Sequence, residues 1–381
     1  MKVVTIVGAR PQFIKAAAVS RVIRNDYAGK IHEILVHTGQ HYDDNMSKVF
    51  FDELDIPRPK YNLEISGLQH GAMTGRMLEA IEEVLLEEKP DWLLIYGDTN
   101  STLAGALAAA KLHIPVAHVE AGLRSFNMRM PEEVNRILAD RVSSCLFCPT
   151  ETAVNNLKAE GIQHGVYNVG DVMYDVALFY RDRVREQSTI LRTLGLEQGH
   201  FSLATCHRAE NTDDATRLGD ILSALSKIAT QHPVVMPLHP RTLKLIGDYG
   251  LAQLLDNLTV TDPLPFLDMV ALEQASRVIL TDSGGVQKEA FFYGVPCITM
   301  RDETEWVETV DLGWNQLVGA STDAILSAMN GIMQSPREGV TSKPYGTGKA
   351  AQDILAHLDG PQAKVNSTGT DTDTDTDNII A

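Results

Sequence analysis

Short runs of apolar and β-branched residues alternate along the chain with longer stretches of helical periodicity. The apolar runs cover residues 3–7, 33–36, 92–96, 116–119 and 146–148 in the first half, and residues 201–205, 234–237, 258–260, 278–281 and 297–300 in the second. The helical stretches include residues 14–23, 73–88, 101–112, 132–142, 217–231 and 267–274. Strands of about five residues that alternate with longer helices are typical of βαβ units in parallel sheets. The pattern therefore predicts an α/β protein with two doubly wound sheets.

The boundary between the two repeats of this pattern falls near residues 168–171, and a helix is expected at residues 172–185. We predict one Rossmann-like domain over residues 1–169 and a second over residues 170–345. From residue 360 the composition becomes polar, and residues 370–377 repeat Thr-Asp. A disordered acidic tail is therefore expected at residues 360–381.

Composition narrows the class of protein. The 381 residues include 33 Lys and Arg against 50 Asp and Glu, and the resulting net charge of -17 disfavours nucleic acid as a partner. No apolar stretch approaches the ~20 residues that cross a bilayer, and the first apolar run is too short for a secretory signal. Four scattered cysteines without a disulfide framework favour a reducing, cytoplasmic location.

Polar motifs follow the predicted strands of the first half, at the end of the sheet where open α/β folds bind ligands. Arg10 comes directly after the first strand and Lys15 lies in the next helix, so both are candidates for holding a phosphate, although a solvated turn explains them equally well. Asp98, Glu120 and Glu132 follow the next strands or open a helix. Helix capping or the helix dipole explains each carboxylate alone, but three at neighbouring sheet ends suit proton transfer at carbon.

The most specific motif of the second half is Asp282-Ser283-Gly284-Gly285, which ends one predicted strand and opens a helix. Two glycines allow the backbone to approach a ligand, and the Ser283 hydroxyl with the glycine amides is suited to a diphosphate. Glu289, about one turn further on, is a candidate acceptor for ribose hydroxyls.

Basic side chains follow two other strands of the second half: His207 and Arg208 after the first, His239 and Arg241 after the second. In an acidic protein this clustering suggests a local anion site. For each histidine alone, a hydrogen-bonded loop position remains the commoner explanation.

No His or Cys spacing is typical of a metal site. Cys145 and Cys148 lie within a predicted strand, where residues three apart face opposite sides, and the twelve histidines include no HExxH pair. We expect neither a metal nor another cofactor.

Taken in order, these motifs resemble the non-hydrolysing UDP-N-acetylglucosamine 2-epimerases, from residue 2 to about residue 358. The matching residues are Gly8-Ala9-Arg10-Pro11-Gln12 with Lys15, Gly97-Asp98-Thr99, His118-Val119-Glu120-Ala121-Gly122-Leu123-Arg124, Pro131-Glu132-Glu133 with Asn135-Arg136, His207-Arg208 and Asp282-Ser283-Gly284-Gly285. The resemblance implies a glycosyltransferase-B fold with two Rossmann-like domains facing a cleft, and a C-terminal helix at residues 346–359 that returns to the first domain. It also implies a homodimer and a role in polysaccharide biosynthesis.

The reaction implied by the resemblance interconverts UDP-GlcNAc and UDP-ManNAc. A proton leaves C2 while UDP leaves C1, and both return to the glycal intermediate with the configuration at C2 inverted. The implied acid and base groups are Asp98, Glu120 and Glu132, with His207 stabilising the departing diphosphate. The residues implied to bind phosphate, sugar or nucleotide are Arg10, Lys15, Arg136, Arg208, His239, Phe266, Ser283, Gly284, Gly285 and Glu289.

The chain departs from the common family pattern at several positions. Gln12 stands where the family has Glu, Cys206 where it has Gly, and Trp306 where it has Arg; residues 40–43 lack the Arg of members that a second UDP-sugar regulates. These departures resemble the branch that acts on UDP-2,3-diacetamido-2,3-dideoxyglucuronate, which is the alternative substrate. A glycosyltransferase of the same fold or a non-catalytic nucleotide-sugar sensor would share the UDP site, but the three carboxylates argue against both.

Overall fold

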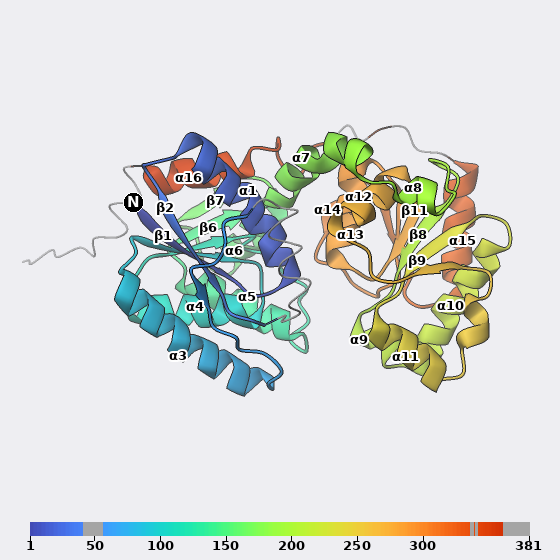
Figure 1. Cartoon of the computed structure of the whole chain (residues 1–381), viewed down its shortest axis with the longest axis horizontal. Coiled ribbons are helices and arrows are strands. Elements are labelled where there is room, and N and C mark those ends of the chain that lie inside the picture. Colours follow the sequence, from blue (N-terminus) through green and yellow to red (C-terminus); the bar gives the residue numbers. More distant parts are fainter. Residues whose placement is uncertain (41–55, 336–338, 340–341, 361–381) are drawn as a thin grey trace, which may run out of the picture.

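The computed structural model describes residues 1–40, 56–335, 339 and 342–360, and within these ranges the chain forms two parallel sheets with flanking helices (Figure 1). The strands of the first sheet are β1 (Lys2–Val7), β2 (His32–His37), β3 (Tyr61–Asn62), β4 (Trp92–Tyr96), β5 (Val116–Val119), β6 (Cys145–Cys148) and β7 (Val166–Asn168). Those of the second are β8 (Ser202–Thr205), β9 (Val234–Pro237), β10 (Thr259–Thr261), β11 (Val278–Thr281), β12 (Cys297–Thr299) and β13 (Asn315–Leu317). The α/β class with two doubly wound sheets is confirmed.

The order of the strands creates a switch point in each sheet. The strand order is β3-β2-β1-β4-β5-β6-β7 in the first sheet and β10-β9-β8-β11-β12-β13 in the second. Neighbouring strands in these sheets are parallel. The chain direction across the sheet reverses between β1 and β4, and again between β8 and β11. Ligands of open α/β sheets bind at such points, beyond the carboxyl ends of the strands.

Helices cover both faces of each sheet. Those that follow first-sheet strands are α1 (Arg10–Asp26), α3 (His70–Glu88), α4 (Asn100–Lys111), α5 (Pro131–Val142) and α6 (Glu151–Ala159). The later ones are α7 (Val172–Gln187), α8 (Ile190–Thr193), α9 (Ala209–Thr212), α10 (Ala215–Ala229), α11 (Pro240–Asp248), the short 3-10 helix η1 (Ala252–Leu255), α12 (Phe266–Ala275), α13 (Gly284–Tyr293), α14 (Val307–Asp311), α15 (Thr322–Gln334) and α16 (Ala350–Asp359). None of the helices in the described ranges is both long and apolar enough to span a bilayer.

Burial on both faces explains why the central strands read as continuous apolar runs. Every residue of β4 is buried, and so is every residue of β6. Cys145 packs in one apolar cluster and Cys148 in another, as expected for residues on opposite faces of a strand. All four cysteines are buried free thiols.

Helix α7 connects the two halves of the molecule. Its first turn is capped by Asp171, whose carboxylate accepts a hydrogen bond from the Met173 amide at 2.8 Å. The helix packs against α1 and α16 on one side and against α12 and α13 on the other, and it lies between the two sheets in Figure 1. Asp175 accepts hydrogen bonds from the amides of Ala350 and Ala351, so α7 also fixes the start of α16.

The expected helix at residues 346–359 is shorter than predicted, because α16 begins at Ala350. Gly346 and Gly348 have φ angles of +85° and +80°, in the left-handed region that a right-handed helix excludes. The Cβ of any other residue at position 348 would lie 2.3 Å from Leu178 Cδ1, so that residue would have to displace the leucine side chain as well as adopt a positive φ angle. The helix packs against α1, which follows the first strand of the first sheet. The expected acidic tail lies almost wholly outside the described residues.

Candidate functional site

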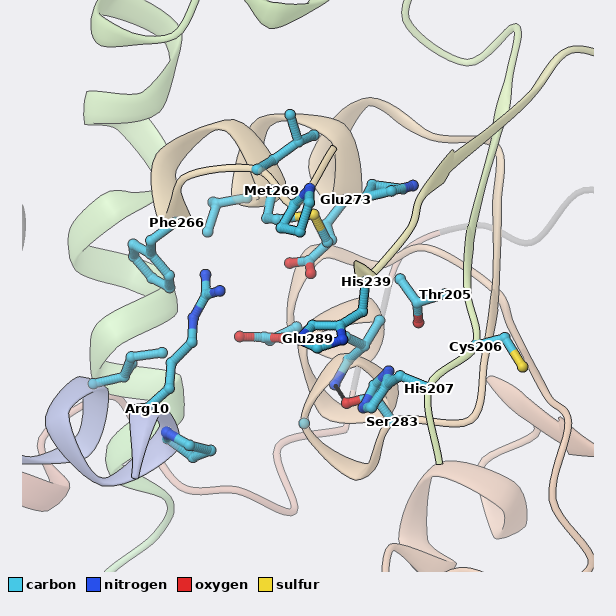
Figure 2. A pocket seen from close by; sticks show the side chains of 18 of the residues that line it. Arg10, Thr205, Cys206, His207, His239, Phe266, Met269, Glu273, Ser283 and Glu289 are labelled. Carbon is cyan, nitrogen blue, oxygen red and sulfur yellow. Dashed lines mark hydrogen bonds between the residues drawn. The ribbon is translucent and has the colours of Figure 1, made fainter. Parts of the chain in front are cut away.

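A cavity of about 490 Å³ lies between the carboxyl ends of the two sheets. From the first sheet it is lined by Arg10, Pro11 and Ile14 of α1. From the second sheet its lining includes His207, His239, Arg241, Phe266, Ser283, Gly285 and Glu289. Figure 2 shows Arg10 extending from α1 toward Phe266 and Glu289 on the opposite side. Residues almost 300 positions apart in sequence therefore face one space.

The Asp282–Ser283 turn is held against the end of β8. The buried Asp282 carboxylate accepts hydrogen bonds from the backbone amides of His207, at 3.0 and 3.1 Å, and of Arg208 at 3.0 Å. Ser283 caps α13 by accepting a hydrogen bond from the Val286 amide. Asp282 thus places the half-exposed His207 ring beside the N-terminus of α13, where the helix dipole favours an anion.

The two glycines of this turn have different surroundings. A Cβ on Gly284 would lie 2.6 Å from Glu305 Oε1, so any other residue at the first position would displace the Glu305 carboxylate. A Cβ on Gly285 would meet its nearest side-chain atom, Ser283 Oγ, at 3.8 Å, and Gly285 lines the cavity. The second glycine therefore leaves the backbone amide accessible from the cavity.

Two carboxyl groups, Glu273 and Glu289, also line the cavity. Burial raises the pKa of Glu273 well above its usual range, and the nearby Glu289 raises it further. Burial also raises the pKa of Glu289, against the effects of Lys288 and Arg10. Glu273 Oε2 has no hydrogen-bond partner among the described residues. The raised pKa values of both carboxyl groups reduce the negative charge that these side chains bring to the cavity.

Glu120 lies at the end of β5 in a buried ion-pair cluster. Its carboxylate contacts the Lys15 ammonium, and its Oε1 accepts a hydrogen bond from Lys288 Nζ at 2.8 Å. Burial opposes ionisation, but the two ammonium groups hold the pKa of Glu120 at about 2. Its φ angle of +69° is one that non-glycine residues rarely adopt, and such backbone strain is concentrated at functional sites.

Asp98, at the end of the neighbouring strand β4, has a different cationic partner. Its carboxylate contacts the Arg136 guanidinium, which also donates to Glu133 Oε2 at 2.6 Å. The Asn135 side chain donates to the Asp98 carbonyl at 2.9 Å. The Asp98 side chain is 28% exposed, whereas the Glu133 side chain is almost fully buried. Asp98 is therefore oriented from α5 and remains accessible.

Glu132 and Glu133 lie on different sides of α5. Glu132 is exposed, and Glu133 accepts hydrogen bonds from the backbone amides of Ser125 and Phe126 in addition to Arg136. Adjacent helical residues are about 100° apart around the axis, so only one of the two faces this loop. The role of Glu132 as an acid or base remains a prediction.

Arg10 and Lys15 contact different parts of the site, although the sequence predicts that both hold a phosphate after the first strand. Five residues on an α-helix correspond to a rotation of about 140°, so the two side chains leave α1 in different directions. Arg10 lines the cavity, and Lys15 reaches Glu120. Of the other predicted binding residues, Arg136 is engaged by Asp98 and Glu133, and Gly284 packs against Glu305.

Two departures from the family pattern have clear structural settings. Gln12 is buried and uses its whole amide: Oε1 accepts from the amides of Gly8 and Ala9, and Nε2 donates to the Tyr96 carbonyl at 2.8 Å and to Thr102 Oγ1. Trp306 is also buried and packs with Tyr345 and Phe291. The pattern at residues 41–43 lies outside the described part of the chain.

Sequence reasoning did not single out Asp171, Glu273 or Lys288, and it assigned no role to Glu133. Lys288 and Glu289 are adjacent in α13, and only the assembled fold shows that one faces Glu120 and the other the cavity. A lysine or glutamate on an otherwise apolar helix face is the signal that points to such positions. In the residues that the structure describes, no group of three or more His, Cys, Asp or Glu side chains is arranged to hold a metal ion.

Comparisons with known proteins agree with this geometry. The family model described as UDP-N-acetylglucosamine 2-epimerase matches residues 24–359. The UDP-2,3-diacetamido-2,3-dideoxy-D-glucuronate 2-epimerase of Pseudomonas aeruginosa is 55% identical over 94% of this chain and 99% of its own. The crystal structure of Methanocaldococcus jannaschii UDP-GlcNAc 2-epimerase with UDP-GlcNAc and UDP is 42% identical, with a TM-score of 0.87 over 94% of this chain and 99% of that one. The Neisseria meningitidis enzyme bound to UDP-GlcNAc is 32% identical, with a TM-score of 0.85 over the same shares. The chain therefore belongs to the UDP-N-acetylglucosamine 2-epimerase family and has its glycosyltransferase-B-like fold.

Proposed function

We propose that this protein is a UDP-sugar 2-epimerase that works by elimination and re-addition of UDP. A carboxylate takes the proton from C2, the C1–O bond breaks with its electron pair going to UDP, and a glycal remains in the cleft. A proton is then delivered to the other face of C2, and UDP returns to C1. The sum is an isomerisation, so the reaction needs no oxidant or reductant.

The observation that carries this proposal is that two sets of groups lie at the carboxyl ends of the two sheets, which meet where Lys288 of α13 contacts Glu120. Carboxylates Asp98 and Glu120 end neighbouring strands of the first sheet. The Ser283–Gly285 turn and His207 end neighbouring strands of the second. General acid–base catalysis requires the first set, and a departing diphosphate is stabilised by the second. Proton transfer and C1–O cleavage can then occur on the same bound sugar.

A carboxylate whose pKa is about 2 is a weak base, so substrate binding must alter the surroundings of Glu120. In this proposal the incoming diphosphate draws the Lys15 ammonium away from Glu120. Loss of one of its two cations raises the pKa of Glu120 toward the range useful for proton transfer. In this proposal Asp98 or Glu132 serves the opposite face of C2, and His207 and Arg208 stabilise the leaving diphosphate.

For the nucleotide we propose the cavity between α1, α12 and α13. Its remaining candidate groups are Arg10, His239, Phe266 and Glu289. The Phe266 ring packs edge-on against Tyr180 with a centroid separation of 5.2 Å. This contact holds Phe266 in place as an apolar part of the cavity lining. The raised pKa of Glu289 suits a carboxyl group that exchanges hydrogen bonds with ribose hydroxyls.

For the sugar we propose UDP-2,3-diacetamido-2,3-dideoxyglucuronate as the first candidate and UDP-GlcNAc as the second. The relative with 55% identity is named for the former sugar, whereas the relative with 52% identity is named a UDP-N-acetylglucosamine 2-epimerase homolog and those at 42% identity and below are named UDP-N-acetylglucosamine 2-epimerases. Trp306, in place of the family's Arg, is a further reason to separate this chain from the UDP-GlcNAc enzymes.

The test is incubation of the enzyme with each UDP-sugar in D2O, followed by NMR at C2. Deuterium at C2 together with the manno-configured product supports the proposal, and the faster sugar identifies the substrate. Absence of deuterium with both sugars would refute it. A glycosyltransferase of this fold would show no exchange at C2 and would need an acceptor.

The proposal extends to organisation and location. Residues 1–169 together with α16 form one domain, and residues 170–345 form the UDP-binding domain. The enzyme acts as a homodimer in the cytoplasm, in polysaccharide biosynthesis. Gel filtration with light scattering tests the dimer, and a monomeric mass would refute that part.

A further inference from the structure

Lys288 is a buried cation between the two sheets that no step of the proposed reaction uses. Its Nζ donates to Glu120 Oε1 at 2.8 Å and to Asp171 Oδ2 at 2.5 Å. The same Nζ lies 3.8 Å from the centroid of the Trp306 ring. Lys288 belongs to α13, whose first turn is the proposed diphosphate site. One helix therefore connects the diphosphate site to the candidate base.

The charges around Lys288 are balanced. Lys15 comes from α1, Glu120 from the end of β5, Asp171 from the start of α7 and Lys288 from α13, so two ammonium groups face two carboxylates. Asp171 is fixed in place, because its other oxygen caps α7. A buried cluster of this kind tolerates the loss of one member poorly, since an unpaired charge then remains in a low-dielectric setting.

The Trp306 ring is the third partner of the Lys288 ammonium, after Glu120 and Asp171. A lysine ammonium over the face of an indole ring is attracted by the ring's electron density. An arginine at this position, as in the common family pattern, would place a second positive group beside the ammonium. Trp306 and Lys288 therefore belong together, and the departure at position 306 has a physical reason.

We propose that Lys288 is a positioning residue that holds the Glu120 carboxylate in its reactive orientation when the diphosphate is seated on α13. The inference rests on the proposed function and deepens it. When the diphosphate draws Lys15 away, Asp171 and Trp306 keep Lys288 in place, so Glu120 retains one fixed partner. Orientation is preserved while the base strength of Glu120 increases.

The test compares Lys288→Met with the double variant Lys288→Met/Asp171→Asn. The single variant leaves two buried carboxylates with one lysine, so its stability falls. The double variant again has one lysine and one carboxylate, so its thermal midpoint returns toward that of the wild type. Turnover of the better sugar, UDP affinity by calorimetry and the pH dependence of kcat/KM are measured for all three proteins.

We expect kcat to fall by about 10²-fold in both variants, because displacement of a catalytic group by about 1 Å costs this much. UDP affinity should change far less than kcat. Glu120 faces Lys15 and Lys288 directly, and Asp171 lies beyond Lys288. Both variants remove the Lys288 ammonium, so the pKa of Glu120 rises. The acid limb of kcat/KM should therefore move to higher pH in both variants.

Recovery of turnover and of the wild-type pH profile in the double variant, along with its stability, would overturn the inference and leave a structural role. Wild-type turnover in Lys288→Met would overturn it as well. A wild-type enzyme that exchanges no deuterium at C2 of either sugar would overturn the proposed function, and with it this inference.

Discussion

The substitution Gln12→Glu tests why this chain has an amide where the family has a carboxyl group. The change replaces one NH2 group by an oxygen, but Nε2 donates to the Tyr96 carbonyl at 2.8 Å and to Thr102 Oγ1 at 3.0 Å. An ionised Glu would place a charged oxygen against the carbonyl oxygen. A protonated Glu keeps one of the two donated hydrogen bonds.

The expected cost depends on pH. Loss of one hydrogen bond costs about 1 kcal/mol. Holding a carboxyl with an ordinary pKa of about 4.3 in its protonated form costs about 1 kcal/mol at about pH 5 and about 4 kcal/mol at about pH 7.5. The folded-state pKa of this Glu is raised above its unfolded value, so its penalty grows as pH rises. The total is about 2 kcal/mol at about pH 5 and at most about 5 kcal/mol at about pH 7.5.

Urea unfolding of the wild type and Gln12→Glu at the two pH values measures this difference. Gln12→Met is the control, because it loses the amide's hydrogen bonds without adding a titratable group, and its penalty should not change with pH. A Gln12→Glu protein that is equally destabilised at both pH values, or not at all, would refute the reasoning.

Three further predictions concern the site and its supports. Asp98→Asn and Glu120→Gln should each lower kcat by at least about 10²-fold while UDP affinity by calorimetry changes little; turnover within a few-fold of wild type would remove that residue from the mechanism. Arg10→Ala should weaken UDP binding and turnover together, since Arg10 lines the cavity, and unchanged affinity would contradict its placement there. Burial raises the pKa of Asp175 to about 6, so the folded state keeps a proton that the unfolded chain has lost, and the contribution of Asp175 to stability should fall by at most about 3 kcal/mol between about pH 4 and about pH 6. Asp175→Asn should abolish that fall in thermal unfolding, and an unchanged pH dependence would assign it to other groups.

The sequence was sufficient for the parts of the fold that depend on local pattern. The strands at residues 92–96 and 116–119 are those of β4 and β5, because their apolar runs are buried on both faces. The placement of Asp98 and Glu120 at one sheet edge followed directly from these strands. The late start of α16 was also foreseeable, since Gly346 and Gly348 precede it.

Contacts between distant segments were not predictable from one sequence. Lys288 and Glu120 are 168 residues apart, and their pairing depends on how α13 sits against the first sheet. Which of Glu132 and Glu133 turns inward depends on the rotation of α5, which its own sequence does not determine. The helical rotation between Arg10 and Lys15, by contrast, was available from spacing alone.

The central claim is that proton removal at C2 and cleavage of the C1–O bond occur on the same bound sugar. A UDP-sugar with 18O in the oxygen that bridges C1 and the β-phosphate, incubated with the enzyme in D2O, tests this directly. We predict that deuterium enters C2 while 18O moves from the bridging position into the non-bridging oxygens of the β-phosphate. Deuterium exchange at C2 without any movement of 18O would contradict the claim.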